Sequence, residues 1–120
     1  MQKVEYRVAV SQDRRAARIE TVLDGEVQAW SDPSAEDLSG IIDILIATRA
    51  KMLDEVPRDL EPGARLPVTP DPIWRADTLN DGHIRLRLRH PGAGWLEFQF
   101  PPESSAGLVD FLTRSRQFPP

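Results

Sequence analysis

Residues 83–89 read His-Ile-Arg-Leu-Arg-Leu-Arg, the clearest alternation of polar and apolar residues in the chain. This period of two predicts a β-strand with one buried and one exposed face, because successive side chains of a strand point to opposite sides. The segment 95–100 alternates in the same way and follows a turn at 90–94, which contains Pro91, Gly92 and Gly94. A further strand is expected over 73–78, before a turn at 80–82. Together these segments predict three antiparallel strands.

The N-terminal part of the chain has the same order of elements. Alternation predicts strands over 3–10, 18–23 and 26–30. Asp24-Gly25 separates the second strand from the third and is a strong signal for a tight hairpin, because both residues tolerate positive φ. The side chains that we expect to face inward on the first strand are Val4, Tyr6, Val8 and Val10.

A helix is expected after each set of strands. The first extends over about 34–54, begins at Pro33 or Ser34, and places an apolar stripe toward the core. That stripe consists of Leu38, Ile41, Ile42, Leu45, Met52 and Leu53. The second helix starts at 101–103 and carries Leu108, Phe111 and Leu112 on one side.

A proline-rich connector over 56–72 joins two pseudo-repeats, 1–55 and 73–117. We expect neither a helix nor a central strand in it, because proline lacks the backbone N–H that both need. Residues 40–45 also match residues 107–112, which favours duplication of one βββα unit. We therefore predict a single α+β domain over 1–120: two βββα units forming one two-layer antiparallel sheet, with both helices on one face. Two halves from separate copies intertwined into a dimer are the alternative.

Composition excludes several classes of protein. The chain has 120 residues, 40% of them hydrophobic, so it is neither disordered nor too short for a core. A net charge of −4 argues against duplex-DNA binding by bulk charge, and the absence of cysteine excludes thiolate chemistry. No apolar run approaches the roughly 20 residues of a membrane span. The N-terminus has no secretory pattern, so we expect a cytoplasmic protein, and we expect a bacterial source. The excess of arginine over lysine in the chain is attributed to a GC-rich coding bias and not to function.

Catalytic and metal-binding motifs are missing from the sequence. His83 and His90 would point to opposite faces of one strand, roughly 20 Å apart, and could not share a metal. Asp43 and Asp110 each lie off the apolar stripe of their helix. Because catalysis needs converging titratable groups, we expect neither an enzyme nor a bound cofactor or metal.

Two surfaces remain as candidate binding sites. The outer face of the first helix carries Gly40, Ile44 and Ala47, and it predicts a seam with a protein partner or a second copy, unless the connector folds back over it. The outer face of the later strands carries Arg85, Arg87, Arg89 and Trp95.

Arginines beside an exposed aromatic residue can bind single-stranded nucleic acid. The same arginines can instead be ordinary surface residues, with Arg87 opposite Glu97 and Arg89 over Trp95. We therefore expect a protein-interaction or dimeric accessory module that uses the outer face of the first helix or the connector over 56–72, with single-stranded nucleic-acid binding as the alternative.

Overall fold

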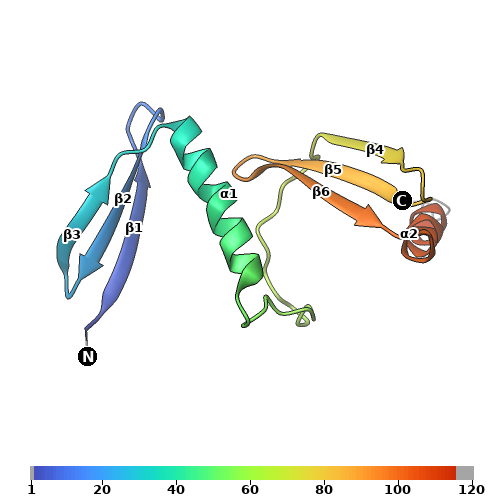
Figure 1. The fold of residues 1–120 in the computed structure, drawn as a ribbon, viewed down its shortest axis with the longest axis horizontal. Coiled ribbons are helices and arrows are strands. Elements are labelled where there is room, and N and C mark those ends of the chain that lie inside the picture. Colours follow the sequence, from blue (N-terminus) through green and yellow to red (C-terminus); the bar gives the residue numbers. More distant parts are fainter. Residues whose placement is uncertain (1, 116–120) are drawn as a thin grey trace. The chain divides into compact units, whose positions relative to one another are not determined.

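The fold is α+β, and the computed structural model describes residues 2–115 of the chain. It divides into two units, Met1–Ala64 and Arg65–Pro120, each with three strands followed by a helix (Figure 1). The last two residues of the predicted second pseudo-repeat lie outside the described residues. The elements are β1 (Val4–Val10), β2 (Ala17–Leu23), β3 (Glu26–Ser31), α1 (Ala35–Lys51), β4 (Trp74–Thr78), β5 (Ile84–His90), β6 (Gly94–Phe100) and α2 (Pro102–Ser115).

The strands form two three-stranded antiparallel sheets, in the orders β1-β2-β3 and β4-β5-β6, and not the one common sheet that we expected. Within each sheet, strands that follow one another in the sequence pair with each other and are joined by short connections. The turn residues between two strands specify this local pairing. The alternation along a strand does not indicate which other strand, if any, pairs with its open edge. The sequence therefore indicated the strands correctly and their grouping incorrectly.

The predicted hairpin at Asp24-Gly25 is confirmed. Both residues have positive φ, 49° at Asp24 and 84° at Gly25, as a two-residue hairpin requires. The β2–β3 register then shifts: Val22 pairs with Val27, but Thr21 pairs with Ala29. Gln28 is thus an extra residue in β3, and this β-bulge moves every later pair by one position.

Burial in the first sheet differs from the prediction. Val22 is the only fully buried large side chain among the described residues, although the alternation placed it on the outer face. It lies on the central strand between Glu5 and Val27, so neighbours cover it from both sides. The predicted inward row of β1 is instead exposed, with Tyr6 73% accessible; its other members are Val4, Val8 and Val10.

Helix α1 begins where the sequence predicted and ends three residues earlier than expected. The Ser34 hydroxyl caps it by accepting a hydrogen bond from the Asp37 backbone N–H at 3.2 Å. Met52 ends it with an extended backbone, and the Arg49 guanidinium donates to the Asp54 carbonyl. No residue of α1 is buried, and within its unit the helix does not pack along β1–β3 (Figure 1). In the predicted core stripe, Leu45, Met52 and Leu53 are exposed, while Leu38, Ile41 and Ile42 are half-buried.

The second sheet has one apolar and one polar face, as predicted. Leu88 pairs with Trp74 and Leu96, and Leu86 pairs with Phe98 across β5 and β6. Helix α2 lies against β6 and closes an apolar cavity of about 290 Å³ over one end of this face. The residues lining the cavity are Trp74, Ile84, Leu86, Phe100, Ser105, Leu108, Val109 and Leu112.

The predicted connector contains neither helix nor strand over 56–72. Its end lies on the second sheet, where Thr69 and Pro72 border an apolar hollow with Leu88, Leu96 and Phe98. None of the helices described in residues 2–115 is long and apolar enough to cross a membrane.

Candidate functional site

The outer face of α1 carries the predicted interface residues, and all three are exposed. Ile44 is 66% accessible, and Gly40 and Ala47 lie one turn before and after it. A Cβ built on Gly40 would meet no atom within 4 Å, so nothing in this structure occupies the space beside it. The neighbouring Leu45 and Ile46 are also exposed. The connector does not cover this face, which was the alternative explanation for Ile44.

A second apolar surface lies on β1. Its even-numbered side chains share one face of the first sheet with Ile19, Thr21 and Leu23 of β2, by the register of the two strands. The opposite face of β1 is charged: Lys3 Nζ lies 3.1 Å from the Glu5 carboxylate, and Arg7 Nη2 lies 3.7 Å from it. Sequence reasoning identified this apolar row but assigned it to the core.

The predicted arginine row lies on the polar face of β5, and two of its three arginines are paired with acids. Arg85 donates to both oxygens of Asp77 on β4. Arg87 Nε donates to Glu97 Oε1 on β6 at 2.8 Å, which confirms the predicted cross-strand pair. These arginines therefore already have anionic partners within their own sheet.

The acids of this face have lowered pKa values. The hydrogen bonds from Arg85, assisted by its positive charge, lower the pKa of Asp77. The pKa of Glu97 is lowered by the hydrogen bond from the Gln99 amide, and next by that from Arg87. Both carboxylates therefore stay ionised near neutral pH and partly cancel the field of the arginines.

Arg89 and Trp95 pair directly across β5 and β6, and Trp95 is half exposed. Among the described residues Arg89 forms no ion pair. The cation–π contact that the structure shows is formed by Arg18 and Trp30 of the first sheet, and not by Arg89 and Trp95. The predicted nucleic-acid residues thus share one face, but only one of the three arginines is free of a carboxylate.

Sequence reasoning missed a cluster on the first sheet. The Arg18 guanidinium stacks over Trp30, with Cζ 4.5 Å from the ring centroid, and also forms a bidentate pair with Asp32 at 2.8 and 3.0 Å. The hydrogen bond and charge of Arg18 lower the pKa of Asp32. A regular hairpin register would place Arg18 opposite Ser31. The bulge at Gln28 shifts the pairing by one residue, so the Arg18–Asp32 pair could be predicted only if the bulge were known.

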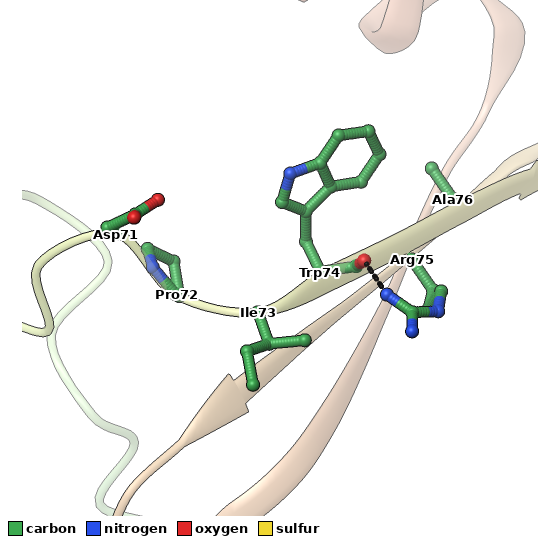
Figure 2. A pocket seen from close by; sticks show the side chains of 6 residues that line it. All are labelled: Asp71, Pro72, Ile73, Trp74, Arg75 and Ala76. Atoms are coloured by element: carbon green, nitrogen blue, oxygen red, sulfur yellow. Dashed lines mark hydrogen bonds between the residues drawn. The ribbon is translucent and has the colours of Figure 1, made fainter.

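A hollow of about 550 Å³ follows the end of the connector (Figure 2). Its lining is one continuous segment, from Asp71 to Ala76. Trp74 and Arg75 extend to opposite sides of the backbone, and Arg75 Nη1 donates to the Trp74 carbonyl at 2.8 Å. No second element contributes a facing group, so this hollow lacks the converging side chains of a built site.

Among residues 2–115, no three histidine or acidic side chains lie close enough together to hold a metal ion. Comparison with family models, curated proteins and solved structures finds no match to this chain. The exposed apolar surfaces of α1 and β1 are therefore the strongest candidates for a functional site, and any function must be argued from their chemistry.

Proposed function

We propose that this chain is a non-enzymatic interaction module, and that the face of α1 around Gly40, Ile44 and Ala47 contacts another polypeptide. The observation that carries the proposal is the exposure of Ile44 on an apolar helix of which no residue is fully buried. An amphipathic helix gains most of its stability from packing of its apolar face, so a helix without such packing lacks a partner. A small residue on each side of Ile44 would let a partner's backbone approach closely.

The titratable side chains also favour binding over catalysis. Several acids and arginines with perturbed pKa values form exposed pairs on a sheet surface, as Asp77 does with Arg85 and Asp32 with Arg18. Such pairs stabilise a sheet surface. Arg18 and Asp32 also border a hollow, but no other titratable side chain lines it, so the converging groups of a catalytic site are missing there. The absence of a bound cofactor and a cytoplasmic location are part of this proposal.

Site-specific photocrosslinking in cells tests the α1 face. Ile44 is replaced by the photoreactive residue p-benzoylphenylalanine, and Ser39 is replaced in a matched control. Ser39 is also exposed and lies about 140° around the same helix. We expect irradiation to give a discrete adduct of higher mass from position 44 and none from position 39. Equal labelling at both positions, or no adduct at position 44, would contradict the proposal.

The second candidate function is binding of single-stranded nucleic acid by Arg85, Arg87, Arg89 and Trp95. Its support is the shared face of these residues, with Arg89 directly opposite an exposed Trp95. It ranks second because Asp77 and Glu97 already pair with two of the arginines.

Fluorescence anisotropy of a labelled single-stranded oligonucleotide tests this candidate. Because the field of the face is partly cancelled, we expect no saturable binding at physiological salt. Saturable binding that weakens steeply with salt and is lost in Arg87→Ala would place nucleic-acid binding first.

Two finer features of the architecture belong to this proposal. We infer that the two units are copies of one βββα module, supported by the matching residues 40–45 and 107–112. We also infer that the helices cover one face of the sheets in the assembled protein. This arrangement would bury the apolar rows of α1 and β1 that are exposed here.

A further inference from the structure

Strand β1 is an open sheet edge whose hydrogen-bonding groups can be assigned residue by residue. The Lys3 carbonyl accepts from the Asp24 N–H at 2.9 Å, and the Ser11 N–H donates to the Ala16 carbonyl at 2.8 Å. Odd-numbered residues therefore turn their backbone groups toward β2. Because these groups alternate along an antiparallel strand, the even-numbered residues of β1 turn theirs out of the sheet. Those residues are Val4, Tyr6, Val8 and Val10, which also carry the exposed apolar side chains.

The other edges are less suited to pairing with another strand. The bulge at Gln28 interrupts β3. Strand β4 has five residues, and its Asp77 is already held by Arg85. Strand β6 has one charged residue, Glu97, so pairing with β6 of a second copy would bring no opposite charge to it. In contrast, β1 has seven residues without proline, glycine or a bulge, and both signs of charge.

We propose that β1 pairs antiparallel with β1 of a second copy of this chain, in a register centred on Tyr6. A two-fold axis perpendicular to the sheet keeps each side chain on its own face, so Tyr6 meets Tyr6 of the second copy. Val4 then meets Val8 on the apolar face. Glu5 meets Arg7 on the polar face, and symmetry repeats this pair. The proposal adds a surface to the proposed function and does not depend on the α1 face.

Charge selects this register among the neighbouring ones. Centring the pair on Glu5 places Glu5 against Glu5, and centring it on Arg7 places Arg7 against Arg7; both are repulsive. Centring it on Val4 brings Lys3 to Glu5 but leaves Val8 and Val10 without partners. Centring it on Tyr6 pairs Val4 through Val8 completely and forms two opposite-charge pairs.

The geometry of the polar pair fits this register. Even-numbered residues make the inter-copy hydrogen bonds, so Glu5 and Arg7 form the non-hydrogen-bonded pairs, whose Cα atoms approach to about 4.5 Å. Both side chains are accessible, 41% for Glu5 and 53% for Arg7. Their contact within one strand is loose, at 3.7 Å, and Glu5 also contacts Lys3 at 3.1 Å. Because exposed ion pairs contribute little free energy, neither contact prevents Glu5 and Arg7 from pairing with the second copy.

Reciprocal charge reversal tests the pairing, with the dissociation constant of the dimer measured by sedimentation equilibrium. Glu5→Arg and Arg7→Glu each place like charges opposite one another, and we expect each to raise the dissociation constant roughly tenfold or more. The double variant restores opposite charges, and we expect it to return to within roughly threefold of the wild type. Circular dichroism checks that every variant keeps its sheet content.

A backbone variant provides an independent check. Val8→Pro removes an N–H that points away from β2, so the parent sheet keeps its own hydrogen bonds. We expect this variant to fold and to remain monomeric. A dimer that tolerates Val8→Pro, or a double variant that is no better than the single ones, would overturn the proposal.

The outcomes separate this inference from the proposed function. A monomeric wild type that still crosslinks at position 44 overturns the β1 pairing and leaves the α1 function in place. A dimer that responds to charge reversal as predicted, without a crosslink at position 44, supports the β1 pairing and contradicts the α1 function.

Discussion

At the residue scale, ion pairs across strands determine the character of the polar face of the second sheet. Arg85 reaches Asp77 on one side, and Arg87 reaches Glu97 on the other. The sequence suggests nucleic-acid binding by this row, but two of its three arginines already have a carboxylate partner in the folded sheet. Cross-strand neighbours decide what a charged strand presents, and alternation along one strand does not reveal them.

The Asp77–Arg85 pair predicts a pH dependence of stability. Arg85 lowers the pKa of Asp77 in the folded state, so the pair contributes stability above the ordinary aspartate pKa of about 3.9. That contribution is lost as the pH falls through the lowered pKa. We expect Asp77→Asn to reduce the melting temperature at about pH 7 by roughly a few degrees, because the pair is exposed. The difference from the wild type should vanish in strong acid.

Thermal melting followed by circular dichroism over this pH range measures the effect. Asp43→Asn is the matched control, because Asp43 is exposed and forms no ion pair with the described residues. Equal melting temperatures for Asp77→Asn and Asp43→Asn at every pH would contradict the account.

At the element scale, the strands and helices were largely predictable from sequence. The alternation at 83–89 and the Asp24-Gly25 turn are local signals, and β5, β6 and the first hairpin follow them within a residue or two. The cap at Ser34 is equally local. The bulge at Gln28 was not predictable, because no glycine or proline indicates it, and so the Arg18–Asp32 pair was missed.

The open edge of β1 predicts an alternating pattern of amide protection. In a monomer, the amides of the odd-numbered residues Glu5 and Arg7 are hydrogen-bonded to β2, while those of Tyr6 and Val8 face solvent. Pairing with a second copy would protect Tyr6 and Val8 as well. We expect hydrogen exchange measured by NMR to show slow exchange at Tyr6 and Val8 at high protein concentration, and faster exchange on dilution. Fast exchange at both amides at all concentrations would contradict the pairing.

At the scale of the whole molecule, the sequence could not indicate which apolar surfaces are buried within one chain. The stripe of α1 and the row of β1 have the periodicity of core elements, and we assigned both to one core. The row of β1 and the later part of the α1 stripe are exposed in the structure, while Val22 on the other face of the first sheet is buried. Periodicity identifies a face that needs a partner, but it does not distinguish a partner in the same chain from one in another. The candidate site on α1 was predictable for the same reason, since Ile44 lies off the expected core stripe.

Sedimentation equilibrium of the wild-type chain is the most direct test of self-association through β1. The measurement spans micromolar to millimolar protein at low and at high salt. We predict a species of twice the 13.5 kDa chain mass that forms with increasing concentration. Its backbone and apolar contacts should persist at high salt, while its dissociation constant rises modestly as the Glu5–Arg7 pairs are screened. A single species of one chain mass at every concentration and salt would contradict self-association through β1.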